Sequence, residues 1–250
     1  MKLSNKYKWR DKDYTWIFEP IKTSPIIISI PHDRCFCSYD FFGFFESRKM
    51  GVIGRDKNVW PIVRDILLVV EVGVVRGCFP RQFVDYNRPL IKNEDEKYEV
   101  AIADKSLQYV YDVYHDSISR LIKKAISRFG KKKCLLLDFH GFKNQPDYGN
   151  YDIIIGTSNR LSVNSEIDKR FHSFMYKRGY KVFLPGSMPI RSVDNDKYSG
   201  RFTVINYSKK FDIDAMQIEI SRKFRTAKGK KIREKLSADV ADFLKKEFEL

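Results

Sequence analysis

The chain has 250 residues, of which 43% are hydrophobic and 32% are charged, and its formal net charge is +15. This composition is typical of a globular protein and excludes a disordered chain. No stretch approaches the ~18 to 20 consecutive apolar residues that span a membrane, and the charged start lacks the apolar core of a signal peptide. We therefore expect a cytoplasmic protein without membrane contact.

The surplus of positive charge raises the question of nucleic-acid binding. The lysines fall in short groups on predicted helix faces and turns, and no basic arm, helix-turn-helix or RNA-binding aromatic signature accompanies them. We expect a solvated basic surface that could attract an acidic substrate. Nucleic-acid binding stays open as an alternative.

Short β-branched apolar runs alternate with longer amphipathic stretches, which is typical of an α/β fold. Strands are predicted at 25–31, 72–79, 134–139, 151–156, 181–184 and 215–220. Helices are predicted at 58–70, 106–129, 165–178 and 230–248. Because the strands are nearly continuous apolar runs, we expect a three-layer α/β/α fold with a mixed, mostly parallel central sheet. We expect a single domain over residues 1–250.

The cysteines are not spaced as metal or redox motifs. Cys35 and Cys37 form a CxC rather than a CxxC pair, and Cys78 and Cys134 stand alone. We expect buried thiols that pack as small apolar side chains, and a disulfide or a ligand role is the alternative.

Three predicted strands deliver reactive side chains at their carboxyl ends, where open α/β sheets bind ligands. "PIIISIP" is followed by His32, "LLLDFH" carries Asp138 and His140, and "AMQIEI" carries Glu219. A buried carboxylate is costly unless it is paired, hydrogen-bonded or bound to a metal. Two histidines and an acid suit a zinc site that leaves one position open. Structural roles, such as a Glu219–Arg222 ion pair, are the alternative for each residue alone.

The stretch "FPRQFVDYNRP" at 79–89 adds two arginines to this group. The planar guanidinium of arginine binds a carboxylate through two hydrogen bonds, so Arg81 and Arg88 could hold a substrate carboxylate. Pairing with Asp85 and neighbouring acids is an equal alternative.

Taken together, six segments resemble the N-formylglutamate amidohydrolase family over roughly residues 25 to 225. The segments are "SIPHDR", "FPRQFVDYNRP", "VYHDSISRLI", "LLLDFHGF", "YDIIIGT" and "MQIEISRKFR". The resemblance implies the zinc-carboxypeptidase-like α/β fold and a metal-dependent hydrolase that cleaves the amide bond of an N-acyl amino acid such as N-formylglutamate.

The resemblance also implies roles for individual residues. His32 and His140 match zinc ligands, and the third ligand is an acid between them, best matched by Asp56 and less well by Glu46. Glu219 matches the carboxylate that handles the catalytic water. The group matched to binding of the substrate's carboxylate is Arg81, Asn87 and Arg88, and Arg201 in the loop "KYSGRF" could close over the substrate with Tyr198.

Two segments differ from the family pattern, in which PH is usually followed by Ser-Gly and DxH by Ser. Here Asp33 and Arg34 follow His32, and Gly141 follows His140. Two further roles stay open: Asp138 either orients a ligand histidine or makes a core hydrogen bond, and His115 is either structural or a support to the metal site.

We thus expect Zn²⁺ as cofactor and an N-acyl amino acid or short acidic peptide as the binding partner. Two alternatives remain. One is a peptidase or deacylase of the same fold with another acidic substrate, and the other is a non-catalytic basic protein that binds nucleic acid.

Overall fold

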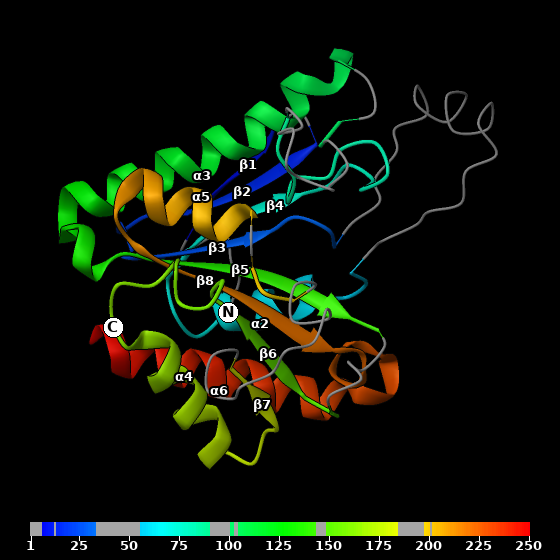
Figure 1. Ribbon diagram of the computed structural model, residues 1–250, viewed down its shortest axis with the longest axis vertical. Coiled ribbons are helices and arrows are strands. Elements are labelled where there is room, and N and C mark those ends of the chain that lie inside the picture. Colours follow the sequence, from blue (N-terminus) through cyan, green and yellow to red (C-terminus); the bar gives the residue numbers. More distant parts are fainter. Residues whose placement is uncertain are drawn as a thin grey trace.

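The computed structural model of the chain describes residues 7–12, 14–33, 56–90, 101–102, 105–143, 149–184, 198–200 and 202–250. Within these residues, one eight-stranded sheet runs through the molecule and helices cover both of its faces (Figure 1). No helix of this described part is long and apolar enough to cross a membrane.

The strands are β1 Tyr7–Lys12, β2 Thr15–Pro20, β3 Ile26–Ile30, β4 Gly73–Gly77, β5 Leu135–Phe142, β6 Ile153–Gly156, β7 Val182–Phe183 and β8 Asp214–Ser221. Their order across the sheet is β1-β2-β4-β3-β5-β8-β6-β7. The central strands β4, β3, β5 and β8 are parallel, whereas β1–β2, β2–β4 and β6–β8 pair antiparallel. The carboxyl ends of β3, β5 and β8 therefore meet at one edge of the sheet.

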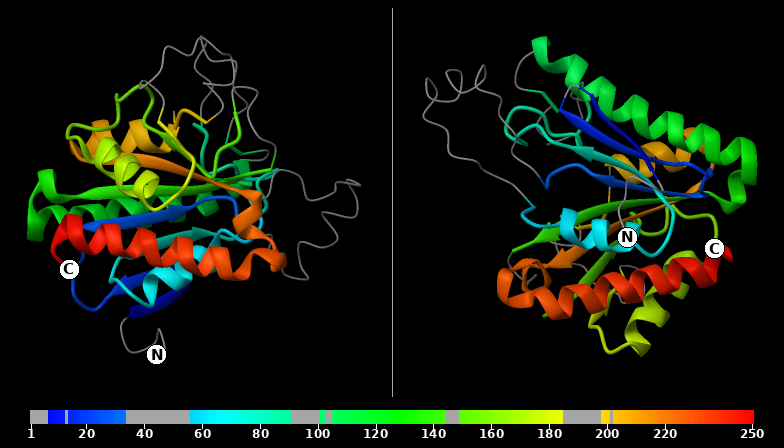
Figure 2. Two further views of the ribbon diagram at one scale, coloured as in Figure 1. Left: turned by 90° about the horizontal axis from the view of Figure 1, so that it is seen from below. Right: turned by 180° about the vertical axis from the view of Figure 1, so that it is seen from behind.

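Helices form a layer on each face of the sheet. The helices are α2 Trp60–Leu67, α3 Gln108–Phe129, α4 Ile167–Lys177, α5 Phe202–Phe211 and α6 Lys230–Phe248. Short 3₁₀ turns are η2 Lys105–Leu107, η3 Lys131–Lys133, η5 Arg222–Arg225 and η6 Ala227–Gly229. One face carries α3 and α5, and the other carries α2, α4 and α6, with α6 running beside α2 (Figures 1 and 2). The predicted fold class is confirmed.

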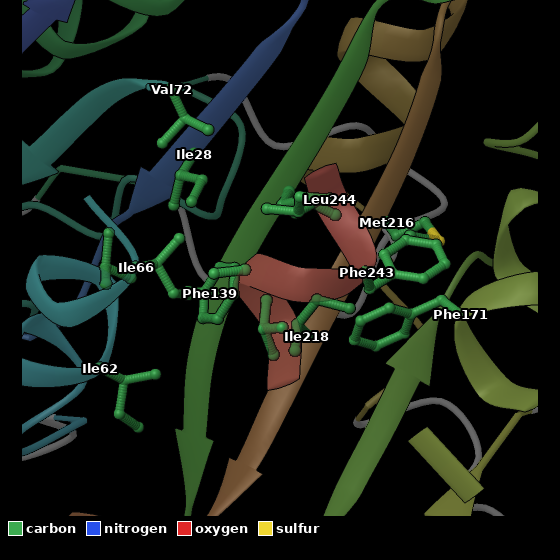
Figure 3. Packing of buried hydrophobic residues seen from close by; sticks show 14 of the residues in the cluster. Ile28, Ile62, Ile66, Val72, Phe139, Phe171, Met216, Ile218, Phe243 and Leu244 are labelled. Carbon is green, nitrogen blue, oxygen red and sulfur yellow. The ribbon is translucent and has the colours of Figure 1, made fainter. Parts of the chain in front are cut away.

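The larger part of the core lies between the sheet and the layer of α2, α4 and α6. Phe139 of β5, Ile218 of β8 and Leu244 of α6 belong to this cluster (Figure 3). Phe243 of α6 contacts Phe171 of α4 edge to face, with ring centroids 5.0 Å apart. Complete burial of such a side chain contributes about 1.5–3 kcal/mol. Since side chains alternate along a strand, the neighbours of Phe139 in β5 face α3 and α5 instead.

Each predicted strand and helix has a counterpart in the structure. Strand β5 runs on to Phe142, so His140 lies within the strand and not beyond its end. The β1–β2 hairpin and α5 were not predicted. The hairpin lies at the edge of the sheet, where β1 reads "YKWRDK" and presents no apolar run. The α5 sequence "FTVINYSKKF" is short and carries β-branched residues, which favour strands.

The prediction of buried thiols is confirmed for two of the four cysteines. Cys78 and Cys134 are free and buried, and burial raises the pKa of the Cys134 thiol to about 11. Cys35 and Cys37 lie outside the described residues.

Candidate metal and catalytic site

Neighbouring parallel strands bring the predicted residues to one face of the sheet. Ser29 of β3 is the Cα partner of Asp138 in β5, and His140 is the partner of Glu219 in β8. Residues paired in register point to the same face, and here that face is the one covered by α3 and α5. His32 follows two residues after the end of β3 and reaches the same place.

His32, Asp56 and His140 converge at this point. The Nδ1 atoms of the two histidines lie 3.2 Å apart. The Oδ2 atom of Asp56 lies 3.1 Å from Nδ1 of His140 and 3.6 Å from Nδ1 of His32. Among the described residues, this is the one group of such side chains whose ligand atoms all lie within 4.8 Å of one another. The structure thus places Asp56 beside the two histidines, whereas Glu46 lies outside the described residues.

The second ring nitrogen of each histidine contacts a carboxylate. Nε2 of His32 lies 2.7 Å from Oδ1 of Asp85, and Nε2 of His140 lies 3.0 Å from Oδ2 of Asp138. Ser29 donates a hydrogen bond of 2.6 Å to the other oxygen of Asp138. Asp138 therefore does both things that the sequence left open, because it contacts His140 and also makes a core hydrogen bond.

The charges around His32, Asp56 and His140 favour a cation. Burial alone lowers the pKa of His140, but the nearby carboxylate of Asp138, with further contributions from Asp56 and Glu219, raises it well above the ordinary value. Burial alone raises the pKa of Asp56, but hydrogen bonds to His140 and His32 outweigh it and lower the pKa. The pKa of Asp85 is lowered in the same way, by the charge and hydrogen bond of His32 and by Arg81.

This donor set fits a metal ion. When Nε2–H of His32 donates to Asp85 and Nε2–H of His140 donates to Asp138, both Nδ1 atoms carry lone pairs. These lone pairs then face each other and the oxygen of Asp56, an arrangement that a cation between them stabilises. A carboxylate behind each ligand histidine is also common in zinc sites. Two histidines and one acid leave room for a further ligand, as in catalytic zinc sites.

Glu219 supplies a second type of group beside these residues. Its side chain is 6% exposed, and its Oε1 accepts a hydrogen bond of 2.9 Å from Nε2 of Gln217. Burial raises the pKa of Glu219 to about 7, although the charges of His140 and Arg225 act in the opposite direction. A carboxyl group with a pKa near neutrality is suited to take up and release a proton.

The segment 79–89 follows β4 and lies against the histidines. Arg81 donates from Nε to Asp85 at 2.9 Å, so the arginine pairing that the sequence left open exists. Burial lowers the pKa of Arg81, but Asp85, Asp56 and Glu219 together raise it. Arg88 donates from Nη1 to the carbonyl of Asn87 at 2.8 Å. Both arginines lie near the site, and their binding of a substrate carboxylate stays a prediction.

Asn87 contacts protein groups through both ends of its side-chain amide. Its Oδ1 accepts hydrogen bonds from the backbone N–H and the hydroxyl of Thr203, at 3.1 and 2.7 Å. Its Nδ2 lies 3.3 Å from Nε2 of His140, and this contact is not a hydrogen bond when Nε2–H of His140 donates to Asp138. Asn87 thus joins the segment 79–89 to α5, and a contact with substrate stays a prediction.

Two further candidates are placed differently. Arg201 lies outside the described residues, while Tyr198 is buried against Phe142 with ring centroids 5.7 Å apart. His115 of α3 is half-buried, with Nδ1 2.8 Å from the hydroxyl of Tyr207 and Nε2 3.1 Å from the carbonyl of Tyr86. These contacts connect α3 to α5 and to the segment 79–89, which agrees with the structural interpretation of His115.

Sequence reasoning missed the contact of Asp85 with His32. The acid was visible in "FPRQFVDYNRP", but the sequence related it only to the neighbouring arginines. Asp85 lies 53 positions from His32, and no periodicity connects them.

Two histidines and a carboxylate thus meet at the carboxyl edge of a mixed α/β sheet, where such folds bind ligands, and this group could hold a metal ion. The family model for N-formylglutamate amidohydrolase matches residues 24–225 of this chain. The chain therefore belongs to the N-formylglutamate amidohydrolase family, whose members are hydrolases that act on amide bonds. A search of curated proteins finds no significant match.

Two of the solved structures with a similar fold match this chain over nearly its whole length. The N-formylglutamate amidohydrolase from Ralstonia eutropha JMP134 is 17% identical, with a TM-score of 0.69 over 95% of this chain and 98% of that one. The gene product Atu2144 from Agrobacterium tumefaciens is 12% identical, with a TM-score of 0.67 over 94% and 95% of the two chains. At these identities the likeness demonstrates the shared fold alone.

Proposed function

We propose that this protein is a zinc-dependent amidohydrolase that cleaves the amide bond of an N-acyl amino acid, of the N-formylglutamate type. The convergence of His32, Asp56 and His140 beside the buried Glu219 is the observation that carries the proposal. Membership of the amidohydrolase family supports the reaction type.

His32, Asp56 and His140 would hold the metal. Bound there, zinc supplies a Lewis acid that polarises the scissile carbonyl and lowers the pKa of water. Asp85 and Asp138 hold the two imidazoles in the tautomer that leaves Nδ1 unprotonated.

Glu219 moves the proton. With a pKa raised to about 7 by burial, its carboxylate accepts a proton from the attacking water and passes it to the leaving amine. The hydrogen bond from Gln217 holds the carboxylate in one orientation. General base catalysis of this kind contributes roughly 10² to 10⁴ in rate.

Arg81 and Arg88 bind the substrate's carboxylate and so orient the amide. Arg81 is suited to this because its side chain is 30% exposed and its Nε is held by Asp85. Within the described part of the chain, the guanidinium of Arg81 makes this one hydrogen bond, through Nε. Its Nη atoms therefore remain available to an acidic substrate. Arg201 belongs to the same expected group.

The experiment is metal analysis of the purified protein, together with hydrolysis of a panel of substrates. The panel compares N-formylglutamate with N-formylaspartate, N-acetylglutamate and N-formylleucine, and includes short acidic peptides. We expect stoichiometric zinc, hydrolysis of an N-acyl acidic amino acid, and loss of both in His140→Ala. Absence of zinc, with activity unchanged in His140→Ala, would overturn the proposal. Cleavage of the peptides alone supports the peptidase alternative, and salt-sensitive nucleic-acid binding that survives loss of the histidine supports the binding alternative.

A further inference from the structure

Asp56 lies on a turn, not on a strand. We call residues 56–59 the Asp56 turn. The backbone N–H of Asp56 donates to the carbonyl of His32 at 2.9 Å, and Asn58 has a left-handed φ of 64°. His140 is positioned by the ladder of β5, but the Asp56 turn has no strand to position it. Its position therefore depends on contacts from other parts of the chain.

Arg225 makes the first set of these contacts. Its Nη1 donates to the carbonyl of Lys57 at 2.6 Å. Its Nε donates to the carbonyl of Ile220 at 3.1 Å, and its Nη2 donates to the carbonyl of Phe142 at 2.8 Å. In return, Nδ2 of Asn58 donates to the carbonyl of Arg225 at 2.7 Å. One buried guanidinium thus joins the Asp56 turn to the ends of β5 and β8.

Gly141 provides the space for this guanidinium. A Cβ atom at residue 141 would lie 2.3 Å from Cζ and 2.5 Å from Nε of Arg225. Any side chain at residue 141 would therefore displace the guanidinium or the strand. Because Gly141 follows His140 directly, this need for a residue without a side chain applies next to a predicted metal ligand.

Asp33 makes the second set of contacts, at the other end of the Asp56 turn. Its Oδ1 accepts a hydrogen bond of 2.8 Å from the backbone N–H of Val59, and its Oδ2 pairs with Arg76. Arg76 lies between the rings of Trp16 and Trp60, with Cζ 4.9 and 4.8 Å from their centroids. Both members of the Asp33–Arg76 pair are buried, so the carboxylate has a fixed position.

We propose that Arg225 and Asp33 are positioning residues for Asp56: they hold the Asp56 turn from two sides, and Gly141 is required because it admits the Arg225 guanidinium. The inference rests on the proposed function, since it concerns the third metal ligand. It also assigns a role to Asp33 and Gly141, which are two of the positions at which the chain differs from the family pattern. Both serve the placement of a ligand and not the choice of substrate.

The test measures the zinc dissociation constant by competition with a chelator. The variants are Arg225→Met, Arg225→Lys, Gly141→Ala and Asp33→Asn. We expect each to weaken zinc binding about 10- to 100-fold, the range seen when support of a ligand is removed. Arg225→Lys keeps the charge but replaces three donor nitrogens by one, which cannot reach the three separate carbonyls, so it distinguishes geometry from charge. It also keeps the proposal testable if Arg225→Met does not fold.

Arg178→Met is the matched control. Arg178 also joins two elements, through Asp239 and Asp242 of α6, but it lies at the end of α4, on the face of the sheet away from the histidines. We expect its loss to lower the free energy of unfolding and to leave zinc affinity within about twofold. If Arg225 had a purely structural role, its substitution would likewise lower the free energy of unfolding and leave zinc affinity within about twofold.

A cobalt-substituted sample provides a readout independent of activity. If Asp56 shifts, the d–d absorption spectrum of bound Co²⁺ changes in Arg225→Lys and Gly141→Ala but not in Arg178→Met. The double variant Gly141→Ala/Arg225→Met should bind zinc about as weakly as either single variant, because both disrupt the same contact. Zinc affinity and cobalt spectra equal to wild type in Arg225→Lys and Gly141→Ala would overturn the positioning role and leave the proposed function standing. Wild-type protein that binds no zinc would overturn both.

Discussion

His140 of β5 and Glu219 of β8 are Cα partners in the parallel register of the two strands. Their side chains therefore point to the same face of the sheet, and the distance between them is set by the backbone ladder rather than by a loop. The pair brings together a predicted metal ligand and a predicted proton carrier on adjacent strands of the central sheet.

Substitution of Glu219 by Gln should abolish most of the activity. The amide keeps the shape and the contact with Gln217 but cannot accept a proton, so kcat/KM should fall about 10²- to 10⁴-fold. Zinc content, measured by metal analysis, should remain stoichiometric. Activity at the wild-type level in Glu219→Gln would exclude the carboxylate as the general base.

The pH dependence of kcat/KM of the wild-type protein should reflect the ionisation of Glu219. Glu219 must be ionised to accept a proton, so kcat/KM should fall as the pH drops below the pKa of its carboxyl group. Burial raises this pKa to about 7, and a bound cation lowers the pKa of a neighbouring carboxylate, so the acid limb should lie at or below about pH 7. An acid limb that persists unchanged in Glu219→Gln would have another origin.

Substitution of Asp138 by Asn should weaken metal binding without removing a ligand. The Asn side chain presents a donor or a weaker acceptor to Nε2 of His140, so the tautomer with an unprotonated Nδ1 is no longer favoured. We expect zinc affinity to fall about 10- to 100-fold by chelator competition. Ser29→Ala is the control: it removes only the hydrogen bond to the other oxygen of Asp138 and should have a smaller effect. The opposite ranking of the two variants would contradict this role of Asp138.

Much of the fold could be predicted because buried parallel strands read as continuous apolar runs. Strands β3, β5 and β8 are of this kind, and each appears in the sequence as a compact hydrophobic segment. Strand β1 does not, because an edge strand pairs on one side only and tolerates the charged sequence "YKWRDK".

The residues of the candidate site likewise differ in how far the sequence predicts them. His32, His140 and Glu219 could be predicted to lie together because each is reached directly from a strand of the same parallel sheet. Asp56 was found only through the family resemblance, because it lies on a turn that no periodicity marks. The contact between Gly141 and Arg225 joins residues 84 positions apart and depends on side-chain packing, which a single sequence does not encode in any local pattern.

His115 should make stability fall as the pH is lowered. Burial lowers its pKa to about 4, whereas an unfolded histidine has a pKa of about 6.5. Below about pH 6.5 the unfolded chain therefore binds a proton that the folded chain does not, and the free energy of unfolding decreases until about pH 4. The loss from this residue should reach about 2 kcal/mol at pH 5 and about 3 kcal/mol near pH 4.

Urea denaturation of wild type and His115→Gln at pH 7 and pH 5, with chelator present, measures this contribution. The variant should be less stable at pH 7, because it loses contacts with Tyr207 and Tyr86, but it should lose less stability on going to pH 5. Both proteins contain the other three histidines, so the difference between their pH dependences isolates His115. Parallel pH dependences would show that His115 is not the source.

Two acids of α6 provide a matched test of what joins α6 to α4 and the segment after it. Asp239 is 5% exposed and accepts hydrogen bonds from the hydroxyl of Tyr180 at 2.7 Å and from Nη1 of Arg178 at 2.6 Å. Glu247 forms a two-point pair with Arg170, but the side chain of Arg170 is 46% exposed. Both acids pair with an arginine, but Asp239 also accepts from Tyr180 and Lys235 and is less accessible to water.

Asp239→Ala should therefore cost more stability than Glu247→Ala. Loss of Asp239 leaves the buried hydroxyl of Tyr180 without its acceptor, and we expect the free energy of unfolding to fall by about 1–3 kcal/mol. Loss of Glu247 removes an ion pair that water screens, and we expect a change of about 0–1 kcal/mol. Tyr180→Phe in the Asp239→Ala background should recover part of the loss, because the unsatisfied hydroxyl is then absent. Urea denaturation at pH 7 measures all three, and equal losses for the two acids would show that burial of the Asp239 contacts contributes nothing.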